Sequence, residues 1–243
     1  MPNPTAAMLV IGDEILSGRT RDSNAHHLAG RLAERGIDLR EVRVIGDEAG
    51  TITRAARELS EAHDHVFTSG GIGPTHDDIT ADSIAAVFGA EIGVRGDARE
   101  ILAAHYERRG TELNEARLRM ARIPEGARLI ENPISAAPGF SLRNIHVMAG
   151  VPQIFEAMLE GLLPRLAGGA ANGTRTLVLD RGEGDIAAPL RDLAARFPEV
   201  SIGSYPAWSG AGYQVAVVIR GADPERLDAA AAALRADFPE ARE

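Results

Sequence analysis

The feature that most constrains the fold is a regular alternation of short apolar runs and amphipathic stretches over residues 6–88. Residues 7–11 form a continuous apolar run that ends in Gly12, as is typical of a strand buried on both faces. The following segments alternate between helical and strand-like patterns, over 22–35, 42–45, 52–62, 65–68 and 80–88. This βαβαβα order predicts an α/β domain in which a parallel sheet is covered by helices on both faces.

The rest of the chain predicts more elements and a second domain. Apolar patterns indicate helices over 97–109, 112–122 and 152–166 and strands over 127–130 and 145–148. The glycine-rich stretch 168–174 is predicted to be a linker, which divides the chain into domains 1–168 and 174–243. Beyond it, the βαββα order of a small α+β domain is indicated by strands at 176–179, 200–205 and 213–219 and helices at 185–197 and 224–238.

Composition excludes several classes of function. The net charge of −9 argues against nucleic acid or an anionic membrane as a partner. The sequence has no cysteine and no lysine, which excludes disulfides, thiolate catalysis, Schiff-base chemistry and a phosphate loop ending in Gly-Lys. It has neither an apolar run long enough to cross a bilayer nor a basic leader, so the cytoplasm is the expected location.

Acidic residues follow each of the first three predicted strands. Asp13 and Glu14 come after the first strand, Asp47 after the second, and Asp77 and Asp78 after the third. In an open parallel sheet these strand ends share one edge, which is where ligands bind. The sequence therefore predicts a ligand site lined by carboxylates at this edge.

The third strand leads into the stretch TSGGIGPTHDDIT at 68–80, for which two interpretations stay open. Gly70, Gly71 and Gly73 lack a Cβ atom, so the backbone can approach a ligand closely and its N–H groups can bind a phosphate. Carboxylates beside a phosphate would need a divalent cation, Mg²⁺ or Mn²⁺, between the two. The alternative is a glycine turn into a helix that begins with a T-x-x-D capping box, from Thr75 to Asp78.

Taken in order, these motifs resemble those of one family. The segments G-D-E-I-L-S-G at 12–18, D-S-N at 22–24, G-D-E at 46–48 and G-G-I-G-P-T-H-D-D-I-T at 70–80 are similar to the motifs of the molybdopterin-binding domain family of molybdenum cofactor biosynthesis. The resemblance continues through Asn132, A-P-G-F at 137–140 and G-V-P at 150–152. The G-P-T-x-D-D form most resembles the branch of the competence/damage-inducible protein A family and the N-terminal part of eukaryotic FAD synthases.

The resemblance implies a three-layer αβα sandwich with a site for a small-molecule nucleotide or pterin. It implies catalytic roles for Asp47 and Asp78, and it makes the second domain similar to the KH-like module of the competence proteins. No G-x-x-G loop lies between two helices of that domain, so we expect no RNA binding. The resemblance also implies a homo-oligomer, a dimer or a trimer, and no deamidase domain, because the competence proteins continue into that domain where this chain ends.

The chain departs from the family pattern in two segments. Ser135 and Ala136 replace the glycine and threonine of a G-T-A-P-G motif. Ala149 and Ile154 replace the proline and the glutamate of a P-G-V-P-x-E motif. The family's substrate specificity therefore cannot be assumed for this chain.

The leading hypothesis is a divalent-metal-dependent hydrolase of nucleotide pyrophosphates such as ADP-ribose or FAD, with Mg²⁺, Mn²⁺ or Co²⁺ as the metal. Asp78, Asp47 and Asp13 would hold the metal, and the three glycines would bind phosphate. The other expected substrate-binding residues are Ser69, Thr75, Asp22, Asn24, Pro138 and Gly139. Two further hypotheses stay open: an adenylyltransferase that acts on molybdopterin, and a non-catalytic module that binds a pterin or a nucleotide.

Overall fold

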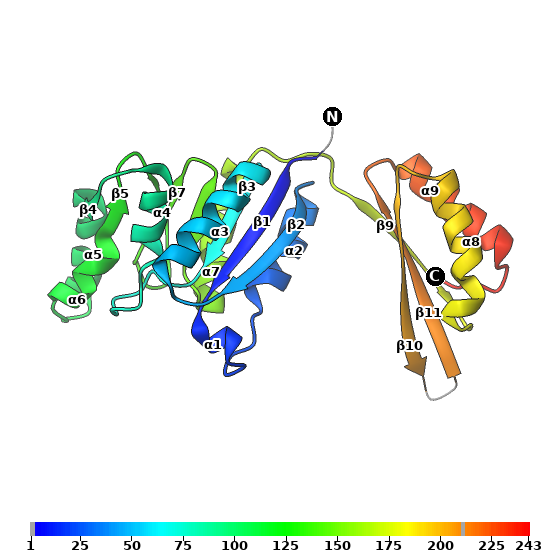
Figure 1. Cartoon of the computed structure of the whole chain (residues 1–243), viewed down its shortest axis with the longest axis horizontal. Coiled ribbons are helices and arrows are strands. Elements are labelled where there is room, and N and C mark those ends of the chain that lie inside the picture. The colour runs from blue at the N-terminus through cyan, green and yellow to red at the C-terminus, as the bar shows by residue number, and fades with distance from the viewer. Residues whose placement is uncertain (1–2, 210–211) are drawn as a thin grey trace. The chain divides into compact units, whose positions relative to one another are not determined.

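The computed structural model describes residues 3–209 and 212–243, and the chain divides into two compact units, Met1–Gly169 and Ala170–Glu243 (Figure 1). The first unit is built on a six-stranded sheet in the order β2-β1-β3-β8-β7-β6. Its strands are β1 Thr5–Ile11, β2 Asp38–Ile45, β3 His65–Ser69, β6 Arg128–Ile130, β7 Gly139–Leu142 and β8 Ile145–Met148. β2, β1, β3 and β8 are parallel to one another, and β7 is antiparallel to both β8 and β6. The mostly parallel sheet expected from the sequence is thus confirmed.

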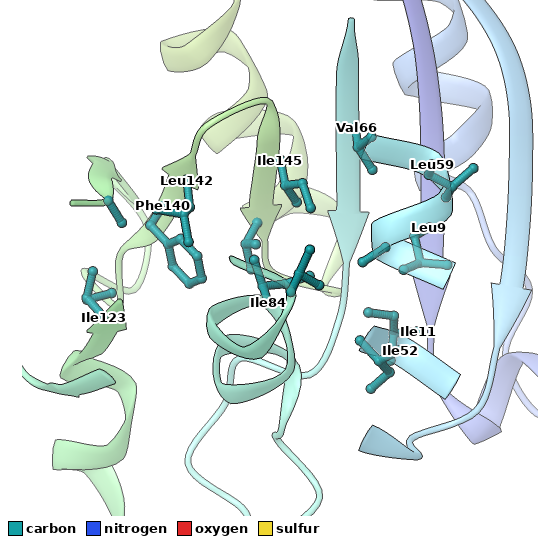
Figure 2. Close-up of a cluster of buried hydrophobic side chains, with 14 of the residues drawn as sticks. Leu9, Ile11, Ile52, Leu59, Val66, Ile84, Ile123, Phe140, Leu142 and Ile145 are labelled. Carbon is teal, nitrogen blue, oxygen red and sulfur yellow. The ribbon is translucent and has the colours of Figure 1, made fainter. Parts of the chain in front are cut away.

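Helices cover both faces of this sheet. They are α1 Asp13–Leu16, α2 Asn24–Glu34, α3 Ala49–Ala62, α4 Thr80–Phe88 and α7 Pro152–Leu162, the last continued by a 3₁₀ turn, η2 Leu163–Arg165. Figure 2 shows side chains of α3 and α4, among them Leu59 and Ile84, packed against Leu9, Val66 and Ile145 of the strands. On the opposite face α2 and α7 pack against a second cluster, which includes Met8 and Phe155. This is the predicted three-layer αβα arrangement.

Strand β1 is apolar throughout because it is covered on both faces. Leu9 belongs to the core under α3 and α4, whereas its neighbours Met8 and Val10 belong to the core under α2 and α7. All three side chains are at most 2% exposed. Successive strand residues point to opposite faces, so a strand in the middle of a three-layer fold needs apolar residues at every position.

The segment between β4 and β5 departs from the sequence-based expectation. The helix expected over 97–109 is present as α5 Gly96–Arg108, but the helix expected over 112–122 is wrong. That stretch instead contains α6 Glu115–Leu118 and the 3₁₀ turn η1 Arg119–Ala121, and it ends in β5 Arg122–Pro124, which pairs with β4 Ile92–Val94. The physical reason is tertiary packing: Ile123 is buried in the core and Arg122 forms an ion pair with Asp82 of α4. Strands β4, β5 and β7 were not expected from the sequence.

The second unit has the expected βαββα order. Its elements are β9 Gly173–Leu179, α8 Glu183–Arg196, β10 Ser201–Ser209, β11 Gly212–Gly221 and α9 Pro224–Asp237. The three strands form an antiparallel sheet in the order β10-β11-β9, and both helices pack on one face of it around Leu177, Val217 and Leu234. β9 begins at Gly173, so 173–174 belong to a strand and not to the expected linker. Similarity to a KH module stays a prediction.

No helix within the described residues combines the length and the apolar character needed to span a membrane.

Two histidines lie together inside the first unit, between β3, β8 and β7. The Nδ1 atom of His65 is 3.2 Å from Nε2 of His146, and Nδ1 of His146 is 2.8 Å from the hydroxyl of Ser141. Burial, and to a smaller extent the neighbouring His65, together lower the pKa of His146 to about 3. Near pH 6.5, where His146 begins to take up a proton in the unfolded chain, His146 of the folded protein is therefore still neutral.

This difference predicts an acid-sensitive first unit. The unfolded chain takes up a proton on His146 below pH ~6.5 whereas the folded unit does so only near pH 3, so stability is lost as the pH falls through this window, at most about 1.4 kcal/mol per pH unit. We expect urea titrations followed by far-UV circular dichroism at pH 7, 6 and 5 to show this slope, and His146→Gln to reduce it. His76→Gln, at a side chain that is 99% exposed, should keep the wild-type slope.

The chain carries an internal control for this experiment. Its single tryptophan, Trp208, lies in the second unit, so tryptophan emission excited separately from tyrosine reports on that unit alone. Equal pH slopes for the wild type and His146→Gln would contradict the prediction.

Candidate functional site

A cavity of about 470 Å³ lies at the carboxyl ends of the parallel strands of the first unit. It is lined by residues that follow β1, β2, β3 and β8, by the start of α7 and by the segment 132–137. Its volume is within the usual range for a small-molecule site. The lining residues are Ile11, Gly12, Glu14, Thr20, Asp47, Gly70, Gly71, Ile72, Gly73, Asp77, Asp78, Met120, Asn132, Ser135, Ala137, Ala149, Gly150, Val151, Pro152 and Ile154.

The register of the sheet explains why these segments meet. Ile11 pairs with Ile45, and Ser69 pairs with both Val10 and Met148, so β1, β2, β3 and β8 all end at the same level. The chain leaves each strand at one edge, as expected for parallel strands. The ends of β1 and β2 are also joined by a hydrogen bond, in which the backbone N–H of Asp13 donates to Oδ2 of Asp47 over 3.0 Å.

The glycine loop that follows β3 needs glycine at two consecutive positions. Gly70 and Gly71 have φ angles of 109° and 68°, which favour glycine. A Cβ atom on Gly70 would lie 2.2 Å from the carbonyl oxygen of Ile11, and one on Gly71 would lie 2.1 Å from Oγ1 of Thr80. The loop backbone is therefore packed directly onto the end of β1 and the start of α4.

This packing leaves three consecutive amide groups of the loop unpaired. The N–H of Gly70 donates to the carbonyl of Met148, and Thr80 donates to the carbonyl of Gly71. Within the part of the chain that the structure describes, the N–H groups of Gly71, Ile72 and Gly73 have no protein acceptor. Consecutive free N–H groups in a glycine turn form a concave site that attracts anions. The expectation that Gly70 offers its N–H to a phosphate is wrong, because the strand pairing uses that group.

Asp78 holds the loop rather than the helix that follows. Its Oδ2 atom accepts hydrogen bonds from the backbone N–H and the hydroxyl of Thr75, at 2.8 and 2.6 Å. Helix α4 begins only at Thr80, and its N-cap residue Ile79 provides no side-chain cap. The capping-box interpretation of Thr75 to Asp78 is therefore wrong: the box closes a turn within the loop. Oδ1 of Asp78 has no hydrogen-bond partner among the described residues.

The rim of the cavity concentrates negative charge around Asp47. Partial burial raises the pKa of Asp47, and the charges of Asp13, Glu14 and Asp77 raise it further, against the N–H of Asp13, which lowers it. In the described chain no arginine or histidine forms an ion pair with Asp13, Glu14, Asp47 or Asp78. This uncompensated charge would be relieved by a bound cation.

The three expected metal ligands are not assembled as a set. Asp47 and Asp78 both line the cavity, but Asp13 does not. Nowhere in residues 3–209 and 212–243 do three or more histidine, aspartate or glutamate side chains form a group that could hold a metal by themselves. What fits this geometry is an ion held by one or two carboxylates together with ligand phosphates, as is usual for Mg²⁺.

The other expected site residues divide into two groups. Gly70, Gly71 and Gly73 line the cavity. The expected substrate-binding residues that do not line it are Ser69, Thr75, Asp22, Asn24, Pro138 and Gly139.

Most of this second group has structural contacts instead. The amide of Asn24 donates to the hydroxyl of Ser69 and to the carbonyl of Gly150, which ties α2 to the ends of β3 and β8. Asp22 accepts from the N–H of Ala25 and so caps α2. A Cβ atom on Gly139 would lie 2.2 Å from the carbonyl oxygen of Val147, because this residue sits in the close β7–β8 pair.

Several residues that line the cavity were not predicted from the sequence to take part in the site. Glu14 lines the cavity in place of its neighbour Asp13, and Asp77 lines it together with Asp78, because the order of residues does not decide which of two adjacent carboxylates faces a site. Asn132 also lines the cavity, and its amide donates to the hydroxyl of Ser135 over 2.6 Å. Ser135 therefore replaces the family's glycine within the cavity wall itself. Ala149 and Ile154, the departures in the second segment, also line the cavity.

Two family models together match nearly the whole chain. Residues 7–168 match the model described as "Probable molybdopterin binding domain", and residues 173–242 match "FAD synthase, middle domain". The two matches coincide with the two structural units, apart from the residues between them.

Individual relatives agree with these matches. A "Probable FAD synthase" of Caenorhabditis elegans is 34% identical over 95% of this chain, but the chain spans only about half of it, 49%. "Protein PH0439" of Pyrococcus horikoshii is 36% identical over 90% of both chains. The crystal structure of "the protein CinA with unknown function from Thermoplasma acidophilum" superposes with a TM-score of 0.61 and 34% identity, over 66% of this chain and 98% of that one. The chain thus belongs to the molybdopterin-binding domain family.

Proposed function

We propose that the first unit binds a nucleotide or a pterin with its phosphates on the glycine loop and cleaves a phosphoanhydride bond with the help of a divalent metal. The observation that carries this proposal is the juxtaposition of two opposite features in one cavity. The free N–H groups of Gly71, Ile72 and Gly73 favour an anion, whereas the carboxylates of Glu14, Asp47 and Asp78, which form no ion pair among the described residues, favour a cation. A phosphate with its metal ion satisfies both at once.

Each part of the cavity then has a distinct role. Asp47, and Asp78 through its free Oδ1, would hold the metal together with phosphate oxygens of the substrate. The metal, when bound, would neutralise the phosphate charge and activate water. The other carboxylate oxygen of Asp78, Oδ2, accepts the hydroxyl of Thr75. This hydrogen bond fixes the loop, so that the N–H groups of the loop stay in place.

Hydrolysis in this arrangement needs a water that attacks phosphorus in line. Glu14, which lines the cavity beside Asp47, would orient that water and take its proton. One P–O bond forms as the bridging P–O bond breaks, and two phosphate monoesters leave. ADP-ribose and FAD are the substrates that we expect to be tested first.

Adenylyl transfer is the second candidate, and one observation favours it. Two relatives that match 95% of this chain, at 34% and 31% identity, are named probable FAD synthases, a name that implies transfer of a nucleotidyl group. The first unit would then need ATP and a second substrate, a pterin or a flavin phosphate.

The two candidates are separated by incubating the chain and Mn²⁺ with ADP-ribose or FAD alone, and with ATP and a pterin together. Turnover of the former without ATP supports hydrolysis, turnover that needs both ATP and an acceptor supports transfer, and ligand binding without either supports the non-catalytic module.

Removing the charge of Asp47 is expected to reduce activity strongly while leaving the fold intact or more stable. Asp47→Asn can still accept the N–H of Asp13, but it weakens the metal site, and we expect turnover to fall by about 100-fold or more, which corresponds to about 2.7 kcal/mol. Because burial and like charges raise the pKa of Asp47, loss of its charge should keep or raise the melting temperature. The measurement is steady-state turnover over a series of Mn²⁺ concentrations, with thermal melting of the same samples.

A matched control for that variant is Asp97→Asn, at an exposed carboxylate paired with Arg95 outside the cavity. It should leave turnover unchanged. Wild-type turnover by Asp47→Asn at every metal concentration would show that Asp47 is not part of the site.

Replacing Gly71 tests the shape of the loop. Gly71→Ala introduces both an unfavourable positive φ and a clash with Thr80, whereas Gly89→Ala at the end of α4 introduces a similar φ, 62°, with no atom within 4 Å of the new Cβ. We expect Gly89→Ala to lower the free energy of unfolding by about 1–2 kcal/mol, and Gly71→Ala to lower it by more. Only Gly71→Ala should also weaken phosphate-dependent ligand binding, measured by calorimetry with ADP. Equal effects of the two variants on binding would contradict a role for the loop.

A further inference from the structure

Strand β2 forms a free edge of the six-stranded sheet and exposes apolar side chains there. It is the terminal strand in the sheet order, and among the described residues of the first unit it pairs only with β1. Val42 and Val44 are 44% and 39% exposed. They pair with Met8 and Val10, so they lie on the face that α2 and α7 cover elsewhere. Long exposed edges with apolar side chains are sites at which another strand can add.

The backbone of β2 is also oriented for such pairing. The carbonyl of Ile45 accepts a hydrogen bond from Gly12, so the polar backbone groups of Ile45 face β1. In a strand these groups alternate in direction from one residue to the next. The N–H and C=O groups of Val42 and Val44 therefore point toward the free edge, and no proline interrupts the strand.

The charges on the other face of β2 are self-complementary. Glu41 and Arg43 flank Val42 and lie on the α3 face, where Arg43 forms ion pairs with Glu41 and with Glu58 of α3. If the segment Glu-Val-Arg runs antiparallel to a copy of itself with Val42 at the centre, each glutamate lies opposite an arginine. Cross-strand neighbours of this kind are about 5 Å apart at Cβ, close enough for ion pairs.

We propose that β2 pairs antiparallel with β2 of a second copy of this chain, with Val42 on the two-fold axis. Val42 then lies opposite Val42 of the partner subunit, and Glu41 lies opposite Arg43 of the partner subunit. The two valines exchange backbone hydrogen bonds, and the two sheets become one continuous sheet. A two-fold axis satisfies both copies with the same surface, as in most homodimers.

The charges select this register over its neighbours. Side chains directly opposite each other must lie on the same face of the sheet. One strand can therefore slide along the other only by two residues at a time, which moves the centre of the pair by one residue. A shift that centres the pair on Arg43 puts two arginines opposite each other, and one centred on Glu41 puts two glutamates there. Like charges directly opposite are destabilising.

The first test is the oligomeric state of single variants. Sedimentation velocity of the wild-type chain over a wide concentration range should show a monomer–dimer equilibrium. Val42→Arg should weaken it by about tenfold or more, since it puts two like charges together on the axis. Val94→Arg, at a valine of β4 that is 47% exposed, is the matched control and should dimerise like the wild type. A wild-type chain that is monomeric throughout, or a dimer that Val42→Arg leaves unchanged, overturns the proposal.

The second test fixes the register by exchanging charges. Arg43→Glu and Glu41→Arg each put like charges opposite one another in a homodimer, so each variant alone should be monomeric. A mixture of the two restores every opposite pair and should form a heterodimer. Because each variant is measured both alone and in the mixture, a loss of folding cannot mimic the result. If Arg43→Glu associates with the wild type in preference to Glu41→Arg, the pair is centred on Arg43 and the proposed register is wrong.

Discussion

The parallel pairing of β1 with both β2 and β3 is the constraint on which the rest of the first unit depends. It requires an apolar side chain at every position of β1, and it forces the intervening chain to return over the faces of the sheet as α2 and α3. It also brings the segments that leave these strands to one edge. The cavity is a consequence of this pairing, because no residue that lines it would meet the others in an antiparallel meander.

The cavity wall carries two kinds of charge, positive partial charge on amide donors and negative charge on carboxylates. The free N–H groups of the loop supply positive partial charge from the backbone, which needs no basic side chain. The carboxylate of Asp47 supplies negative charge that its neighbours reinforce. An acidic protein can therefore bind a phosphate, since the local donors act over a few ångströms whereas the net charge of −9 acts over the whole surface.

The sequence predicted the elements whose pattern reflects burial and failed where distant contacts decide. The regular elements β1, α3 and α4 could be read from apolar periodicity, because each buries a continuous face. The stretch at 112–122 has helical composition, yet the burial of Ile123 draws its end into strand β5. Local energetics cannot reveal such an effect, since the partner strand lies about 30 residues earlier in the chain.

The same distinction holds for the candidate site. The glycines and Asp47 were placed at the sheet edge correctly, because strand ends in a parallel sheet must converge there. Asn24 and Gly139 do not line the cavity, because a polar or glycine residue near a site can serve packing as well as binding. Asn24 satisfies the ends of two strands, and Gly139 permits two strands to approach.

The contact between Gly70 and Gly150 has a consequence for how this cavity could change over evolution. A Cβ on Gly150 would lie 3.2 Å from the Cα of Gly70, so that part of the boundary is made of main chain and has almost no room for variation. Other parts of the boundary are made of side chains such as Ile72, Met120 and Ile154, which lie outside the strands of the sheet. The surface that we propose for phosphate binding would thus be shared by any sequence that keeps the glycines, while the choice of organic group would rest on a few replaceable side chains. One scaffold can in this way pass from one nucleotide-like molecule to another through single substitutions.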